Sequence, residues 1–204
     1  MSQEEMESRR LALIAEVYAA FKGVTREGGV SWRQSRLHDA GVRPYTPREY
    51  REAGEKDKDT GWEELVDDAN WEPETGGAIG GSFSFLDAFG FRYYVPIVLV
   101  RELRDWGSCC LTPWFHLNCP PTNDGQQELR IRQFSALNER QKQCIAAFIR
   151  YAIDRAVAEK DGGLAFEGYA QAWIHYWKQF AGDVANDECD ADLFEDDGSH
   201  DSRS

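Results

Sequence analysis

The chain has 204 residues, of which 42% are hydrophobic and 13% aromatic, and its formal net charge is −13. This length and apolar content predict one domain of ordinary size with a substantial core. Residues 183–204 hold nine acidic residues and one basic residue, so eight of the thirteen net negative charges lie there and five remain in residues 1–182. A chain so poor in clustered Lys and Arg is not expected to bind nucleic acid.

The sequence also argues against a membrane protein and against a disulfide-rich one. The longest apolar run, residues 95–100, is far shorter than the ~20 residues that span a bilayer. The N-terminal segment MSQEEMESRR lacks the apolar block of a signal peptide. The five cysteines are an odd number, and Cys109 is adjacent to Cys110. We therefore expect a cytoplasmic protein with reduced thiols, no cofactor and no membrane contact.

Helix-start signals occur three times in the first 60 residues. Each is a Ser or Thr with Glu or Gln three residues later, or with Pro directly after it. They predict helices over residues 2–21, 31–41 and 46–57. The second and third are short and highly charged, so each is expected to pack only one edge on the core. The apolar face predicted for the first helix consists of Leu11, Ile14, Tyr18 and Phe21.

Residues 83–106, FSFLDAFGFRYYVPIVLVRELRDW, are the most distinctive stretch of the chain. Leaving these aromatic and branched side chains in water would forfeit ~1.5–3 kcal/mol for each large one, so the stretch must form an inner wall of the fold. The composition of residues 91–95 predicts a small extended element, followed by a helix from Pro96 to Arg104. The preceding segment WEPETGGAIGG reads as a flexible loop.

The C-terminal half is predicted to contain two long helices. Residues 108–127, with three prolines and three cysteines, are expected to form a long surface connection. Asn138, with Gln141 at capping-box spacing, begins a helix whose apolar residues repeat every four positions, including Cys144 as a small buried residue. The last helix is predicted to present one apolar face and to end at Gly182, and that face consists of Phe166, Tyr169, Trp173, Trp177 and Phe180.

These elements define the expected architecture. We predict a mainly α protein, with a single compact helical domain over residues 1–182 and a small extended element near residues 91–95. Residues 183–204 are too acidic and too poor in apolar residues to pack, so a disordered tail is expected there.

One cluster of residues has the chemistry of a metal site. Cys109, Cys110, His116 and Cys119 lie within eleven residues, and zinc prefers four such ligands at tetrahedral corners. Against this interpretation, the first two ligands are adjacent and the paired spacing of zinc knuckles is absent. The alternative is a cysteine-rich loop packed on the core.

Two charges interrupt the apolar stretch and allow two interpretations. Asp87 and Arg92 either pair with each other or cap neighbouring backbone, because an unpaired buried charge would be costly. Alternatively they form the rim of a polar pocket together with Tyr93 and the nearby acids Asp57 and Asp59. The sequence leaves both open. His38, in contrast, lies in a charged helix and is expected to be exposed to solvent.

The acidic tail contains two large apolar residues, Leu193 and Phe194, among carboxylates. Some disordered segments of this composition fold on contact with a basic-rimmed groove of a partner. The alternative is a solubilising or autoinhibitory end.

Several blocks resemble a known family, domain of unknown function 6714. They are F-x-G-V at residues 21–24, GGVSWRQSRLHDAG, DKDTGWEELVDD and SFLDAFGFRYYVPIVLVREL, then F-x-x-LN-x-x-Q at residues 134–141, AAFIRY and a closing YW. The block around residues 86–96 is the most specific. The glycine-rich insert at residues 76–81 and the acidic tail depart from the pattern. The resemblance covers about residues 11–180 and implies one intact domain, with no established activity to carry over.

Two hypotheses for function follow, from different classes. The first is a non-catalytic, immunity- or regulator-like module that binds a basic protein partner, since charge complementarity speeds association. The second is a small enzyme with a polar pocket around Asp87, Arg92, Tyr93 and His116, in which zinc could take part. Oligomeric state is not predicted by any feature of the sequence.

Overall fold

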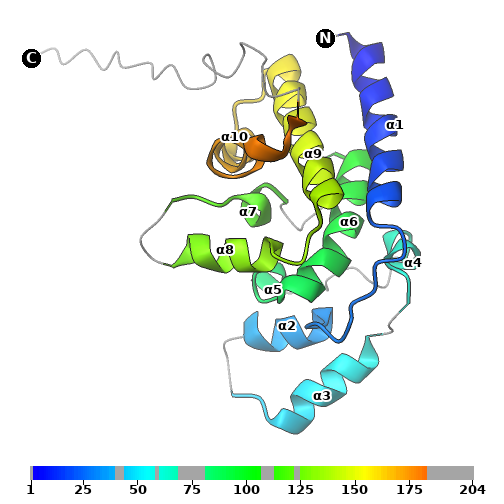
Figure 1. Cartoon of the computed structure of the whole chain (residues 1–204), viewed down its shortest axis with the longest axis vertical. Coiled ribbons are helices and arrows are strands. Elements are labelled where there is room, and N and C mark those ends of the chain that lie inside the picture. The colour runs from blue at the N-terminus through cyan, green and yellow to red at the C-terminus, as the bar shows by residue number, and fades with distance from the viewer. Residues whose placement is uncertain are drawn as a thin grey trace, which may run out of the picture.

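The computed structural model describes residues 2–39, 44–57, 60–68, 81–106, 113–121 and 125–182. Over these residues the chain is helical and contains no strand, which confirms the mainly α fold class. In chain order the elements are α1 (Gln3–Ala20), α2 (Trp32–Asp39), α3 (Pro47–Lys56), α4 (Trp62–Val66), α5 (Gly81–Ser84), α6 (Ala88–Arg104), α7 (Pro113–Leu117), α8 (Gln126–Phe134), α9 (Glu139–Glu159), α10 (Leu164–His175) and the 3-10 helix η2 (Trp177–Phe180) (Figure 1).

Four helices begin where local capping signals predict. The side chains of Ser2, Thr46 and Asn138 each accept a hydrogen bond from the backbone N–H three residues later. The backbone N–H of each donates in return to the side chain of that later residue, which completes a capping box. Ser31 and Gln34 make the same pair of bonds, of 2.9 and 3.3 Å, before α2. These side chains satisfy N–H groups that a helix cannot satisfy itself, so short sequence patterns set the helix starts.

Replacing Asn138 by alanine should lower the free energy of unfolding by about 1 kcal/mol, the usual cost of losing an N-cap. The Asn138 side chain accepts from the Gln141 N–H at 2.9 Å, and Gln141 Nε2 donates to the Ala20 carbonyl of α1 at 3.2 Å. The cap therefore also orients a contact between α9 and α1. Urea unfolding measures the effect, and Asn138→Ser, which keeps an acceptor, is the control. Equal losses in both variants would contradict the assignment.

The predicted extended element at residues 91–95 was wrong, because these residues lie within α6. Asp87 caps this helix by accepting from the Gly90 N–H, so the helix starts before the β-like residues are reached. Every residue from Tyr93 to Val100 is buried. In a helix that is buried on all sides, apolar residues no longer recur every 3.6 positions. Its sequence pattern therefore cannot be distinguished from that of a buried strand. Pro96 stays inside the helix, at a position where burial outweighs its poor helix propensity.

The prediction of a surface connection over residues 108–127 was also wrong for its described part. Pro113 begins α7, and Pro113, His116 and Leu117 are buried. Cys119 is buried as well, and α8 begins after Gly125, whose φ of 78° is left-handed. Proline suits the first turn of a helix because its missing N–H would be unpaired there anyway. The proline signal therefore marked a helix start and not only a turn.

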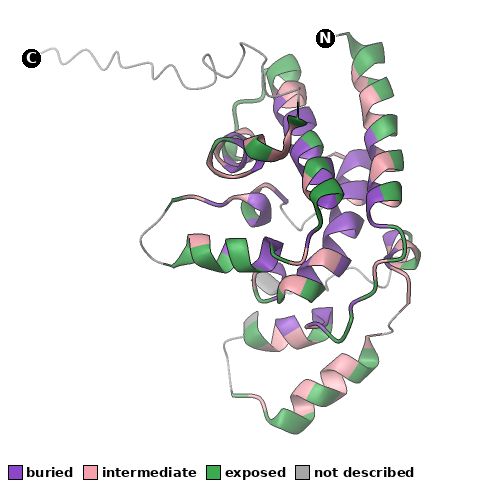
Figure 2. Ribbon diagram, in the orientation of Figure 1, coloured by how far each residue is buried: buried purple, intermediate pink, exposed green. Residues whose placement is uncertain are grey.

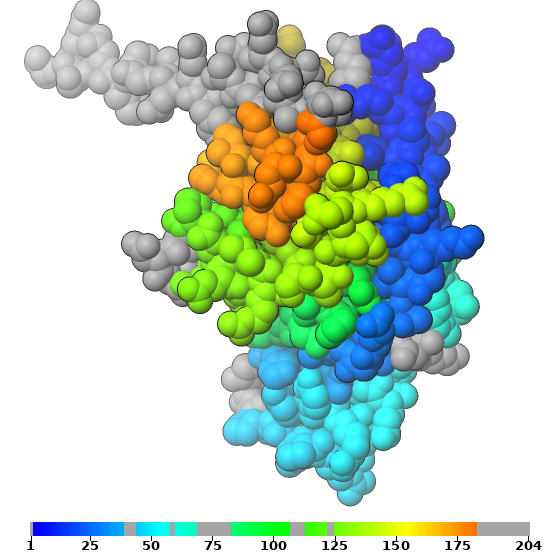
Figure 3. Space-filling view, in the orientation of Figure 1, coloured from blue at the N-terminus to red at the C-terminus, as the bar shows by residue number. Residues whose placement is uncertain are grey.

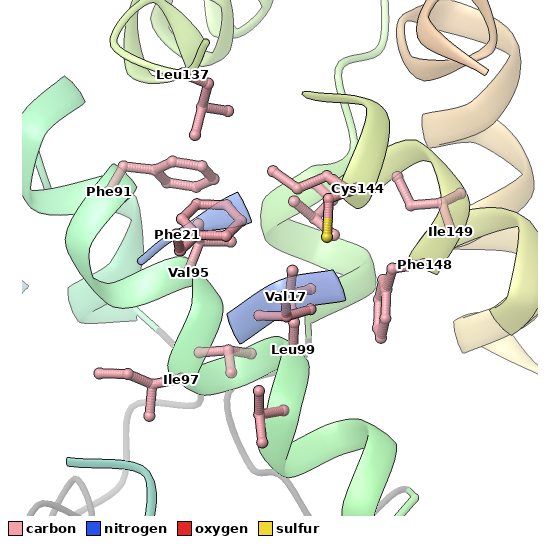
Figure 4. Packing of buried hydrophobic residues seen from close by; sticks show 14 of the residues in the cluster. Val17, Phe21, Phe91, Val95, Ile97, Leu99, Leu137, Cys144, Phe148 and Ile149 are labelled. Carbon is pink, nitrogen blue, oxygen red and sulfur yellow. The ribbon is translucent and has the colours of Figure 1, made fainter. Parts of the chain in front are cut away.

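Buried residues from helices across the chain form one hydrophobic cluster. The α9 helix packs against α1, α10 and η2, and α6 packs against α1, α4 and α8. Figure 4 shows Val17 of α1, Leu99 of α6 and Phe148 of α9 within this core. The α1 helix turns Leu13, Val17 and Ala20 inward, whereas Leu11, predicted on its core face, is 55% exposed. The last helix ends at His175, and η2 continues the apolar face with Trp177.

Helices α2 and α3 lie together at one end of the molecule (Figures 1 and 3). Among the described residues of α3 none is buried, as Figure 2 shows. Trp32 at the start of α2 anchors the pair, since it is only 4% exposed and packs edge-on against Phe83 and Tyr94. At this end of the molecule every side chain of α3 is therefore at least partly exposed to solvent.

Several predictions concern residues outside the described part. These are the glycine-rich loop at residues 76–80, Cys109 and Cys110, and the tail over residues 183–204 with Leu193 and Phe194. The division into a domain over residues 1–182 and a disordered tail stays a prediction.

Candidate functional site

Asp87 joins two segments that are far apart in the sequence. Its Oδ1 accepts a hydrogen bond from the Gly90 N–H at 2.8 Å and a second from the Val30 N–H at 3.0 Å, across 57 positions of the chain. The carboxylate is exposed, so it carries no burial cost. Asp87 thus caps neighbouring backbone, which is one of the two structural interpretations considered for it.

Arg92 lies one helical turn further along α6 and pairs with a different acid. Its Nη2 donates to Glu27 Oε1 at 2.5 Å, and its guanidinium lies 5.4 Å from the centre of the Phe89 ring. Glu27 has a φ of 52°, in the left-handed region that residues other than glycine seldom adopt. The ion pair therefore holds a strained turn of the 24–31 loop against α6, and Asp87 is not the partner of Arg92 in this pair.

Tyr93 and Tyr94 extend the same junction to two further segments. The Tyr93 hydroxyl donates to the Thr60 carbonyl at 2.5 Å, and the Tyr94 hydroxyl accepts from the Trp32 N–H at 3.0 Å. Burial raises the pKa of Tyr94 well above its ordinary value, and the nearby Asp57 carboxylate raises it further. The Tyr94 hydroxyl therefore stays protonated and is a stable hydrogen-bonding group.

We call these contacts the α6 junction: Asp87, Arg92, Tyr93 and Tyr94 of α6 with the 24–31 loop, Trp32, Asp57 and Thr60. Asp57 belongs to it because its Oδ2 accepts a hydrogen bond from the Arg33 backbone N–H at 2.7 Å. Several of the N-terminal blocks of sequence that resemble the known family contribute residues to this junction. These polar contacts tie α6 to the 24–31 loop, to the start of α2 and to Thr60, and so fix the α2–α3 end to the core.

His116, predicted to share a pocket with Asp87, Arg92 and Tyr93, contacts another part of the molecule. It is 1% exposed, its ring lies 5.0 Å from that of Phe83, and Nδ1 is 3.5 Å from Ser84 Oγ. The enclosed cavity beside it has a volume of about 10 Å³, too small for a substrate. The contacts of these four predicted residues run to separate segments and do not converge on one described cavity.

The zinc hypothesis can be followed only in part. Within the described residues, no group of three or more His, Cys, Asp or Glu side chains could hold a metal ion. Cys119 is buried, with Sγ 3.9 Å from the Gln127 carbonyl oxygen, and burial raises its pKa although Arg130 opposes the shift. Cys109 and Cys110 lie outside the described residues, so the four-ligand site stays a prediction.

Cys144 should react slowly with alkylating reagents in the folded protein. It is 2% exposed, and burial raises its pKa to about 12. At pH 8 this leaves ~1000-fold less thiolate than an ordinary cysteine has, and the thiolate is the reactive form. Iodoacetamide labelling followed by peptide mass spectrometry checks the expectation, with the urea-unfolded chain as control. Labelling of Cys144 at equal rates in both states would contradict its burial.

The structure also brings together four rings that sequence reasoning did not connect. His38 of α2, Tyr45, Tyr50 of α3 and Phe85 form what we call the aromatic cluster. The His38 ring lies 5.1, 5.7 and 6.0 Å from those of Tyr45, Tyr50 and Phe85, and the two tyrosines stack at 5.6 Å. Tyr45 Oη lies 2.9 Å from His38 Nδ1. His38 and Phe85 are exposed, as predicted for His38. The only local signal was a pair of tyrosines flanking the Thr46-Pro47 helix start.

Comparison with known proteins places the chain in a family. The family of unknown function (DUF6714) matches residues 9–181, so the chain belongs to that family, as its sequence motifs predicted. Neither the curated proteins nor the solved structures contain a match to it. None of the helices in the described ranges has the length and apolar content needed to cross a membrane. The family assignment brings no activity with it.

Proposed function

We propose that this protein acts by binding another protein, and that the aromatic cluster is its principal contact surface. The observation that carries the proposal is that four rings from separate segments pack together at the exposed end of the fold. Aromatic side chains, tyrosine in particular, are enriched at interfaces and among the residues that dominate binding energy. Because the rings already pack on one another, little side-chain entropy remains to be lost on binding.

The overall charge supports a basic partner. The net charge of −13 would attract a positively charged protein over long range and speed its association. An immunity- or regulator-like module that neutralises such a partner fits this property. We further propose a cytoplasmic location, supported by the free, buried thiols of Cys119 and Cys144, which a reducing compartment would maintain.

Replacing Phe85 by serine should abolish partner capture while leaving the chain folded. Phe85 is 44% exposed, so the expected loss in the free energy of unfolding is only about 1 kcal/mol, whereas loss of an interface anchor weakens binding by ~30-fold or more. Affinity capture from cell extract, followed by quantitative mass spectrometry, measures retention of each captured protein.

Leu11→Ser is the matched control, because Leu11 is 55% exposed on α1, a helix that contributes no ring to the aromatic cluster. A chain lacking residues 183–204 tests the tail separately. The proposal requires a protein retained by the wild type and by Leu11→Ser but lost with Phe85→Ser. If no specific protein is retained by either the full or the shortened chain, the binding proposal fails.

The enzyme hypothesis remains the rival from another class. The geometry of Asp87, Arg92, Tyr93 and His116 does not favour it, because their contacts tie segments of the fold together. Elemental analysis separates the two hypotheses. Zinc that survives dialysis at one ion per chain would support the enzyme.

A further inference from the structure

A second surface, which shares no residue with the α6 junction, contains a concave apolar site. It has a volume of about 390 Å³ and is formed by α9, by Trp173 of α10, by the end of η2 and by Glu16 of α1. This size is within the range of pockets that bind small ligands or a few side chains. We call it the α9 groove. Its walls include Cys144, Ala147, Trp173, Phe180 and Gly182.

One wall of the α9 groove also carries polar groups. The Arg150 side chain is 7% exposed, pairs with Asp154 at 2.9 Å, and lies 5.9 Å from the centre of the Trp173 ring. The Trp173 indole N–H is buried and has no acceptor among the described residues. A buried donor without an acceptor is unfavourable. With its apolar lining and the cationic Arg150 at one wall, the groove suits an apolar side chain that is accompanied by a carboxylate.

The position of the chain end suggests what occupies the groove. Gly182, the last described residue, is itself part of the groove wall, and 22 residues follow it. Leu193 and Phe194 are the only adjacent pair of large apolar residues among them, and Asp192 and Glu195 flank the pair with carboxylates. Eleven residues can extend ~36–40 Å, so the pair can reach back to the groove without strain.

We propose that the α9 groove binds the chain's own tail, with Leu193 and Phe194 in the apolar part and an adjacent carboxylate beside Arg150. The inference is independent of the aromatic cluster. Ten residues connect Gly182 to the apolar pair, and a connection of this length gives the tail an effective concentration of ~1 mM at the groove. Even an intrinsic Kd of ~0.1 mM would then leave the tail docked about ten times as often as free. While docked, the tail's apolar pair is not available to a partner.

Filling the groove tests this proposal in the full-length chain. Ala147 is exposed on α9 and lines the groove, so Ala147→Trp would occupy it without disturbing the core. We expect chymotrypsin to cleave after Phe194 ~10-fold faster in this variant than in the wild type, because the docked fraction protects the site. Ala158→Trp is the matched control, since Ala158 is exposed on the same helix and is not part of the groove.

A second measurement follows the groove instead of the tail. In the double variant Leu193→Ser/Phe194→Ser, the backbone amides of residues 180–182 should exchange with deuterium several times faster than in the wild type, because the tail no longer docks over them. Equal cleavage rates in wild type and Ala147→Trp, or unchanged exchange in the double variant, would overturn the proposal. Protection that rises with protein concentration would also overturn it, because the occupant would then be the tail of a second copy.

Discussion

Replacing Gly90 by alanine is expected to lower the free energy of unfolding by about 3 kcal/mol, at the upper end of the cost of overpacking. A Cβ atom at this position would lie 2.4 Å from the Val30 carbonyl oxygen and 3.1 Å from Asp87 Oδ1. The first of these atoms belongs to backbone and cannot rotate away. The 24–31 loop would have to move off α6, and the Asp87 to Val30 hydrogen bond would weaken with it. The better helix propensity of alanine would offset only ~1 kcal/mol.

Urea unfolding monitored by circular dichroism measures this effect. Gly162→Ala is the control, because a Cβ atom there would meet no atom within 4 Å. The control should change stability by less than about 1 kcal/mol. If Gly90→Ala were as stable as the wild type, the close approach of the 24–31 loop to α6 would be disproved.

Asp87→Ala should be the second most disruptive of these changes, with a loss of about 2 kcal/mol. The substitution removes the N-cap of α6, worth ~1 kcal/mol, and the acceptor of the Val30 N–H, worth a similar amount. Thermal and urea unfolding measure the loss. Asp87→Asn keeps the Oδ1 acceptor and forfeits only the favourable interaction of a charge with the helix N-terminus, so it should retain most of the stability.

This pair of variants separates the two interpretations of Asp87. A capping role requires that the wild type be the most stable, Asp87→Asn intermediate and Asp87→Ala the least stable. If both variants were as stable as the wild type, Asp87 would have no structural role, and the hypothesis of a functional carboxylate at a pocket rim would gain weight.

Much of the secondary structure could be predicted because helix starts are decided locally. Ser2, Ser31, Thr46 and Asn138 each act on a backbone N–H only three residues away. The burial of Cys144 and the exposure of His38 also followed from their positions on predicted helices. Such signals need no knowledge of the rest of the chain.

The candidate site was less predictable because its partners are distant in sequence. Asp87 and Arg92 were singled out as charges in an apolar stretch, but Val30 and Glu27 could not be identified as their partners, 57 and 65 positions away. His116 was grouped with them only because its side chain could take part in the same kind of chemistry. The structure places it against Phe83 and Ser84. The aromatic cluster was missed because its rings come from segments that are distant in sequence: His38 of α2, Tyr45 and Tyr50 at the start of α3, and Phe85 after α5.

The sequence by itself determined the family, the helical class and the positions where most helices begin, because motif matches and capping bonds are short-range properties. Only the tertiary structure decided that residues 91–95 are helical and that Pro113, His116, Leu117 and Cys119 are buried. It also decided which side chains meet at the α6 junction, the aromatic cluster and the α9 groove. The physical reason is that burial on several sides at once overrides local propensity, and such burial exists only once the helices have packed together.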